Sequence, residues 1–188
     1  MILQRLLDFF VCHYSKVKYR DILTMKEYLY NSTPGRAHLF LERAYLKRMI
    51  EMGFSIGFTA EFKDRPLFPH GLNGIFISGK TKIGKNCTIY QQVTIGSNLL
   101  LDSPNKGAPV IGDNVFVGAG AKIIGNVKVG NNCRIGANAV VAKSIPENSV
   151  VVPMMRFIEK SIPLDNYYYI EKEDGLYRYE SAVLVKVN

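Results

Sequence analysis

The sequence has 188 residues, a hydrophobic fraction of 47% and a formal net charge of +8, which describe a globular chain of one or two domains and exclude a disordered one. Its basic residues are spread along the chain without a nucleic-acid-binding motif, so we expect no nucleic-acid partner. The charge is typical of a solvated basic surface or, as a second interpretation, of a site for a small polyanionic ligand.

The N-terminus is apolar but lacks the features of a secretory signal. Between Met1 and Val11 apolar residues recur at helical spacing, Arg5 and Asp8 interrupt them, and no small-residue cleavage site follows. No apolar run approaches the roughly 18 residues that cross a bilayer. We therefore predict a cytoplasmic protein and leave open a peripheral contact of this segment with a membrane.

Cysteine and histidine are scarce and scattered. The chain contains three of each, namely Cys12, Cys87, Cys133, His13, His38 and His70. The cysteines are too far apart for a disulfide framework or a zinc site, and the histidines lack metal-ligand spacing. We therefore predict no bound metal.

Residues 1–52 are predicted to be helical. Thr24 and Glu27 have the spacing of a capping box, which predicts a helix start at Thr24. Thr33-Pro34 offers a second start, with threonine as the N-cap and proline in the first helical position. Gly53 is the expected end of this second helix, because glycine readily adopts the left-handed backbone at which helices stop.

A six-residue repeat fills residues 53–152. The recurring aliphatic residues are Ile77, Ile83, Ile89, Ile95, Ile111, Val117, Ile123, Val129, Ile135 and Val141. Four positions after them comes a small or β-branched residue, at Thr81, Cys87, Val93, Val115, Ala121, Val127, Cys133 and Ala139. This period is neither that of a helix nor that of a strand. It suits a chain that turns a corner every six residues and keeps both repeated side chains inside.

Three such faces close a triangular coil, and successive coils stack as parallel strands about 4.8 Å apart. Glycines and asparagines recur at the corners, as in Asp113-Asn114, and they tolerate the turn conformations needed there. The predicted fold class is therefore mainly β, a parallel β-helix. Cys87 and Cys133 fall at corner-interior positions, so we expect them to be core residues rather than reactive thiols.

One interruption breaks the repeat. Residues 97–110 do not follow the six-residue repeat and contain the apolar Leu99-Leu100-Leu101. A coil accommodates such an insertion as a loop, and loops on rigid scaffolds are where binding residues collect. We therefore expect this loop to contribute to function.

The C-terminal residues follow a different pattern. Tyr167–Ile170 and Leu176–Tyr179 flank Glu173-Asp174-Gly175, in the arrangement of a β-hairpin. The predicted division of the chain is thus an N-terminal helical segment (1–52), a β-helix domain (53–152) and a hairpin-like C-terminal tail (153–188).

Three motifs in the repeat resemble the hexapeptide-repeat acyltransferases. They are Pro69–Ile77 (PHGLNGIFI), Ile83–Gly96 (IGKNCTIYQQVTIG) and Pro109–Gly125 (PVIGDNVFVGAGAKIIG). The resemblance covers about residues 54–158 and is strongest to the serine acetyltransferase branch, especially to bacterial capsule, exopolysaccharide and lipopolysaccharide O-acetyltransferases. It implies a left-handed coil, a homotrimer, and acyl-CoA bound in a groove between neighbouring β-helices.

The resemblance also implies roles for individual residues. His70 matches the histidine that takes the proton of the acceptor hydroxyl as it attacks the thioester, and such a base typically contributes about 10²- to 10⁴-fold. The residues expected to contact CoA are Gly118, Ala119 and Ala137 along the pantetheine arm, with Lys143 and Arg156 at the phosphates. Gln92 and Asp64 are expected to contact the acceptor. Backbone N–H groups at glycine-rich corners would stabilise the oxyanion.

Three departures from the family pattern bear on substrate and mechanism. Ala108 stands where serine acetyltransferases carry a second histidine that meets serine, which argues against free serine as the acceptor. The aspartate partner of the catalytic histidine is missing from Gly53–Gly57, which leaves Glu61 or Asp64 as candidates. Val152–Arg156 replaces the usual exit sequence at the adenine end of the CoA site.

The first hypothesis is therefore an acetyl-CoA-dependent O-acetyltransferase that modifies a sugar hydroxyl in surface polysaccharide biosynthesis, with His70 as general base. Serine O-acetyltransferase is the alternative within enzymes. A non-catalytic structural β-helix is the alternative outside them, and the presence of His70 argues against it. Zinc-dependent carbonic anhydrases of this fold need several interface histidines, whereas one histidine lies in this repeat.

Overall fold

The computed structural model describes residues 21–153, 169–180 and 183–187. Contacts divide the chain into two compact units, Met1–Met154 and Met155–Asn188, and each is described by itself. The expected N-terminal helix around Met1–Val11 and the expected phosphate contact Arg156 lie outside the described residues.

The first described helix, α2 (Ile22–Asn31), begins before the predicted start. Asp21 is its N-cap, and the carboxylate accepts a 3.0 Å hydrogen bond from the backbone N–H of Leu23. Thr24 lies inside the helix, where its hydroxyl donates to Asp21. A carboxylate at this position satisfies a free N–H and lies at the positive end of the helix dipole, which explains why Asp21 rather than Thr24 is the cap.

The second helix, α3 (Arg36–Met52), begins at the N-cap Gly35, so Thr33-Pro34 belongs to the connection and not to the helix start. Its predicted end is confirmed. Gly53 adopts the left-handed conformation with φ of 69°, and its N–H donates to the carbonyl of Ile50. A side chain at this φ is strained, which is why glycine serves as the stop.

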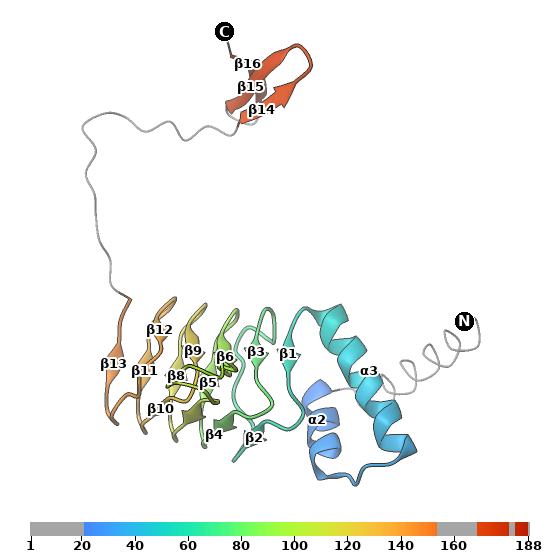
Figure 1. Cartoon of the computed structure of the whole chain (residues 1–188), viewed down its shortest axis with the longest axis vertical. Helices are drawn as coiled ribbons and strands as arrows, with labels where there is room; N and C mark the ends of the chain where they lie inside the picture. Colours follow the sequence, from blue (N-terminus) through green and yellow to red (C-terminus); the bar gives the residue numbers. More distant parts are fainter. Residues whose placement is uncertain (1–20, 154–168, 181–182, 188) are drawn as a thin grey trace. The chain divides into compact units, whose positions relative to one another are not determined.

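After α3 the chain forms a left-handed parallel β-helix with three faces, which confirms the predicted fold class (Figure 1). Face A consists of β1 (Ser55–Ile56), β3 (Phe76–Ile77), β6 (Thr94–Gly96), β9 (Lys122–Ile124) and β12 (Val140–Val141). Face B consists of β2 (Glu61–Phe62), β4 (Lys82–Ile83), β7 (Val110–Ile111) and β10 (Lys128–Val129). Face C consists of β5 (Thr88–Ile89), β8 (Phe116–Val117), β11 (Arg134–Ile135) and β13 (Val150–Val151).

The interior of the β-helix is built from the six-residue repeat. Every repeated aliphatic residue and every small or β-branched corner residue predicted to point inward is at most 3% exposed. Equivalent residues stack directly on one another, as in Ile77↔Ile95 and Ile95↔Ile123. Cys87 and Cys133 are buried in this core, and burial raises the pKa of the Cys87 thiol. Both are therefore core residues, as predicted.

The three corners of the coil form three edges that run along the β-helix. Edge AB, between faces A and B, consists of residues 57–60, 78–81, 97–109, 125–127 and 142–144. Edge BC consists of residues 63–66, 84–87, 112–115, 130–133 and 146–149. Edge CA consists of residues 69–75, 90–93, 118–121 and 136–139. The predicted loop is part of edge AB, where Leu99, Leu100 and Leu101 are exposed and Asn98 pairs with Gly107.

Helices α2 and α3 cover the N-terminal end of the β-helix (Figure 1). Strands β1 and β2 begin faces A and B, so one side of each has no neighbouring strand among the described residues. The buried hydroxyl of Tyr45 donates to the carbonyl of Ile56 at 2.7 Å, and the buried Lys26 ammonium donates to the carbonyl of Ala60 at 2.5 Å. The helices thus satisfy backbone groups of an edge that would otherwise be open to pairing. Residue 52 therefore marks a change of secondary structure within one compact unit.

The C-terminal unit contains three antiparallel strands, β14 (Tyr169–Lys172), β15 (Gly175–Glu180) and β16 (Val183–Lys186). The predicted hairpin is confirmed as β14 and β15. Asp174 in its turn accepts hydrogen bonds from Tyr177 at 2.7 Å and from Lys186 at 3.0 Å, so it links β15 and β16. The sequence pattern did not predict β16. Within the described part of the chain, no helix combines the length and apolar character needed to cross a membrane.

Candidate active site

His70 lies on an enlarged corner of edge CA. The inward residues Phe68 and Ile77 are nine positions apart rather than six, so the corner holds three additional residues. The resulting turn covers residues 69–74, and Gly71 and Gly74 have φ of 70° and 64°. Positive φ values of this kind favour glycine. The additional residues therefore form a larger turn on this corner, and the His70 side chain is exposed.

Two residues of the next coil hold the His70 ring. The Nδ1 atom of His70 lies 2.8 Å from Oε1 of Gln91. The ring of Tyr90 meets the imidazole edge to face, with centroids 5.3 Å apart and an interplanar angle of 86°. Tyr90 in turn packs on Phe116 at 5.1 Å. The imidazole thus has Nδ1 paired with Gln91, a T-shaped contact with Tyr90, and no described partner at Nε2.

Edge CA also carries backbone N–H groups that have no partner among the described residues. These belong to Gln91, Ala119 and Ala137, which occupy equivalent positions in successive coils. On either side of each, the neighbouring N–H groups bond to adjacent coils, as Gly120 does to Gln91 and Asn138 to Ala119. The edge therefore presents a row of donors beginning next to His70.

The equivalent N–H groups on edge BC are closed by side chains. The N–H of Lys85 donates to Asp113 Oδ1, and the N–H of Asp113 donates to Asn131 Oδ1, both at 2.8 Å. Beside them runs a ladder of side-chain amides whose members all have positive φ, namely Asn86, Asn114, Asn132 and Asn148. Edge CA has alanine at the places where edge BC has these capping side chains, so its donors remain available to a ligand.

Gln92 occupies an unusual position beside this row. Its φ is 61°, whereas the equivalent left-handed positions of edge CA hold Gly74, Gly120 and Asn138. Its N–H donates to the carbonyl of Asn73, and its carbonyl accepts a 2.7 Å hydrogen bond from the Lys122 ammonium. A left-handed residue that is neither glycine nor asparagine carries strain of order 1–3 kcal/mol, which is typical of functional sites.

The remaining predicted site residues that the structure describes lie away from edge CA. Asp64 is on edge BC, where its carboxylate accepts the backbone N–H of Asn86 at 3.0 Å and 3.1 Å. Glu61 on face B pairs with Lys82 at 3.0 Å. Lys143 is exposed on edge AB. The structure thus brings His70, Gln92, Gly118, Ala119 and Ala137 together on edge CA, and within this chain it places Asp64 and Lys143 elsewhere.

Sequence reasoning missed Tyr90 and Gln91 as partners of His70. A signal was present: the next two coils have Gly118-Ala119 and Gly136-Ala137 at the equivalent positions, so Tyr90-Gln91 departs from the repeat. Such a departure from the repeat indicates residues with a role other than forming the corner.

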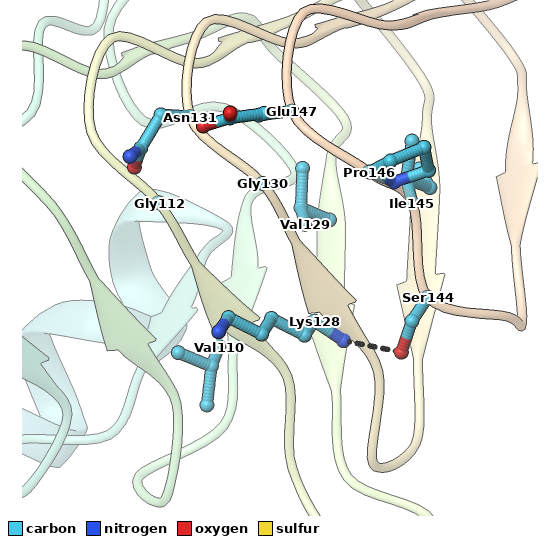
Figure 2. A pocket seen from close by; sticks show the side chains of 10 residues that line it. All are labelled: Val110, Gly112, Lys128, Val129, Gly130, Asn131, Ser144, Ile145, Pro146 and Glu147. Atoms are coloured by element: carbon cyan, nitrogen blue, oxygen red, sulfur yellow. Dashed lines mark hydrogen bonds between the residues drawn. The ribbon is translucent and has the colours of Figure 1, made fainter.

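A separate open pocket of about 420 Å³ lies on face B and its flanking edges (Figure 2). Its lining includes Val129 and Gly130, and Lys128 donates its backbone N–H to Ser144 Oγ at 3.0 Å. Its lining does not include His70 or the other edge CA residues. Among the described residues, no cluster of three histidine, cysteine or acidic side chains is arranged to hold a metal ion.

Comparison with known proteins supports the sequence resemblance. Residues 108–143 match the family "Bacterial transferase hexapeptide (six repeats)". A serine acetyltransferase of Staphylococcus aureus is 43% identical over 108 residues, covering 57% of this chain and 49% of that protein. One of Staphylococcus epidermidis is 40% identical over 129 residues, covering 65% and 59%. The chain therefore spans about half the length of the curated relatives that it matches.

Solved structures give the same result. The native serine acetyltransferase 1 of Entamoeba histolytica aligns with a TM-score of 0.58 and 28% identity, covering 70% of this chain and 49% of that one. The Neisseria gonorrhoeae serine acetyltransferase in complex with serine aligns with a TM-score of 0.52 and 29% identity, covering 63% and 46%. These findings confirm the resemblance to the hexapeptide-repeat acyltransferases, and the relatives and structures named here are serine acetyltransferases.

Proposed function

We propose that this protein transfers the acetyl group of acetyl-CoA to a hydroxyl group of its acceptor, with His70 as the general base. The observation that carries this proposal is edge CA, where an exposed imidazole stands at one end of a row of unpaired backbone donors. Acyl transfer from acetyl-CoA requires a base that deprotonates the acceptor hydroxyl, and a row of N–H donors can bind the amide-containing arm of CoA.

The reaction needs one base that later acts as an acid. His70 Nε2 takes the proton of the acceptor hydroxyl while the hydroxyl oxygen attacks the thioester carbonyl. The tetrahedral oxyanion then collapses, the carbon–sulfur bond breaks, and the ester forms. The imidazolium returns its proton to the departing CoA thiolate, which leaves neutral His70 and free CoA. Neutral imidazole suits this cycle because an ordinary histidine titrates near neutral pH.

The pantetheine arm of CoA would run along edge CA, with its amide carbonyls accepting from the N–H groups of Ala119 and Ala137. Gly118 lies on this path, where a Cβ would come within 2.7 Å of the Ala137 nitrogen, so the position stays without a side chain. Lys143 and Arg156 stay proposals for the phosphates, as does Asp64 for the acceptor. Gln92, strained and next to Gln91, has the better position for an acceptor contact.

Edge BC supplies a design for testing the donor row. Asn131 caps the N–H of Asp113 from one coil further on, and residue 137 has the same relation to Ala119. Ala137→Asn is therefore expected to close the Ala119 N–H with its own side-chain oxygen. Losing one hydrogen bond of about 1 kcal/mol should raise KM for acetyl-CoA roughly five- to tenfold with an unchanged melting temperature.

The control for Ala137→Asn is Ala142→Asn, which adds the same side chain to an exposed alanine on edge AB. Steady-state kinetics at varied acetyl-CoA measure both variants. An equal change of KM in the two variants, or none in Ala137→Asn, would contradict a CoA path along edge CA.

For the acceptor, the comparisons favour serine, since the relatives described above are serine acetyltransferases. A saccharide in polysaccharide biosynthesis is the second candidate. The observation that favours it is Ala108, half-buried in the edge AB loop, whose methyl group cannot bind the amino acid as a histidine would. We further propose a cytoplasmic homotrimer, which light scattering would test as three times the 21.2 kDa chain.

The decisive assay measures thiol release from acetyl-CoA with serine, simple sugars, nucleotide sugars and oligosaccharides as acceptors. We expect His70-dependent turnover with at least one of them. Turnover with serine alone would make Ala108 irrelevant to acceptor choice. Turnover with a saccharide alone would separate this chain from its relatives. No turnover with any acceptor, together with no thermal stabilisation by CoA, would contradict the proposed function.

A further inference from the structure

The partner of His70 is an amide and not a carboxylate. The amide oxygen of Gln91 lies 2.8 Å from His70 Nδ1. The two acidic residues expected from the sequence are engaged elsewhere, Glu61 with Lys82 and Asp64 with the backbone of Asn86. The described contacts of the His70 ring are thus Gln91 and Tyr90, and neither is a carboxylate.

The local backbone fixes Gln91 in this position. Its carbonyl accepts a 3.0 Å hydrogen bond from the N–H of Gly120 in the next coil, while Gln92 bonds to Asn73 in the His70 turn. Gln91 is half-buried, and the ring of Tyr90 meets the same imidazole from the side. The backbone of Gln91 is therefore fixed between two coils, and its side-chain amide extends from this fixed point to His70.

An amide oxygen accepts hydrogen bonds and cannot donate them. With Oε1 facing Nδ1, the proton of neutral His70 must reside on Nδ1, and the lone pair must reside on Nε2. The partner of one ring nitrogen sets the state of the other in this way. An uncharged acceptor also stabilises the imidazolium less than a carboxylate would.

We infer that Gln91 is a positioning residue, which holds His70 as the Nδ1–H tautomer and leaves Nε2 as the proton acceptor, without raising the basicity of the ring as a carboxylate would. This inference rests on the proposed function for its consequence in catalysis. The pairing itself is a property of the resting protein and is testable without turnover.

Three variants separate the parts of this role. Gln91→Ala removes the amide, and it should fold because alanine occupies the equivalent positions 119 and 137. Gln91→Glu replaces the amide with a carboxylate of the same length. Asn73→Asp adds the same charge in the His70 turn from a side chain that lies toward Gly53, with Oδ1 3.9 Å from where a Gly53 Cβ would be.

The first readout is ¹⁵N NMR of the histidine rings as a function of pH. His38 serves as an internal reference, since its Nδ1 pairs with Ser32 Oγ at 2.8 Å, and His70→Ala identifies the His70 signals. We expect the Nδ1–H tautomer in the wild type and a mixture in Gln91→Ala. In Gln91→Glu the His70 titration midpoint should rise by about one pH unit, and by clearly less in Asn73→Asp.

The second readout is the pH profile of kcat/KM with the acceptor that the assay identifies. Gln91→Ala should lower kcat about 10- to 100-fold, the size of effect seen when metal-binding histidines lose their orienting partner. Gln91→Glu should retain turnover with the acid limb moved to higher pH. A profile that follows the NMR midpoint supports the inference, since a merely structural role would not move it.

Two results would overturn the inference: an Nε2–H tautomer in the wild type, or a Gln91→Glu midpoint that moves no more than that of Asn73→Asp. Absence of turnover in the wild type would instead contradict the proposed function, and the NMR arm would still decide the pairing. Melting temperatures of all variants identify any that fail to fold.

Discussion

His70→Ala is expected to lower acetyl transfer by about 10²- to 10⁴-fold, the usual contribution of a general base. A hydroxyl is a weak nucleophile until its proton is removed, and Tyr90 and Gln91, the described neighbours of the ring, are not bases at neutral pH. The side chain is exposed, so its loss leaves no cavity in the core. The melting temperature should therefore remain that of the wild type.

The matched control is His38→Ala, because His38 lies on α3, bonded to Ser32 and packed edge to face on Phe58 with centroids 5.8 Å apart. It should keep full activity. CoA binding should survive in His70→Ala, because the donors of edge CA belong to the backbone. At a CoA concentration of about 100 times the dissociation constant, CoA should stabilise both His70→Ala and His38→Ala by roughly 2.7 kcal/mol. Equal turnover in the two variants would remove His70 from the mechanism.

The coil itself could be predicted because each six-residue unit solves the same packing problem. The inward aliphatic residue has the same environment in every coil, so an aliphatic residue recurs every six positions. All of these repeated residues are buried. Features that occur once in the chain are not marked by a repeated pattern. The cap of α2 at Asp21 and the third C-terminal strand β16 each occur once, and local patterns favoured Thr24 and a two-stranded hairpin instead.

The candidate site divides in the same way. The family resemblance singled out His70, Ala119 and Ala137, and all three lie on edge CA. The unpaired N–H of Ala119 could not be predicted, because it depends on the side chain 18 positions later. For Asp113 on edge BC that residue is Asn131, whose Oδ1 accepts the N–H; for Ala119 on edge CA it is Ala137, which leaves the N–H open. The buried interior is thus the same in every coil, whereas the edges differ in which backbone N–H groups are closed by side chains.

The buried Lys26 at the N-terminal end of the β-helix should make the free energy of unfolding depend on pH in the alkaline range. Lys26 is 3% exposed, its ammonium lies 4.2 Å from the centroid of the Phe62 ring and 5.4 Å from that of Tyr30, and burial lowers its pKa from 10.5 to about 8, opposed by Glu27. Below pH 8 both folded and unfolded chains hold this proton. Between pH 8 and 10.5 the unfolded chain holds it and the folded chain does not, so stability rises with pH through this window.

The expected size of this rise is about 3 kcal/mol, since each pKa unit corresponds to roughly 1.4 kcal/mol. Other lysines and tyrosines titrate in the same range, so the measurement is the difference between wild type and Lys26→Met in urea unfolding at one protein concentration. That difference should change by about 3 kcal/mol from pH 7.5 to 10.5. Lys47→Met, at an exposed position of α3, should give a difference that is flat with pH. A flat difference for Lys26→Met as well would mean that Lys26 keeps its proton in the folded protein, and that Ala60 accepts from an ammonium throughout.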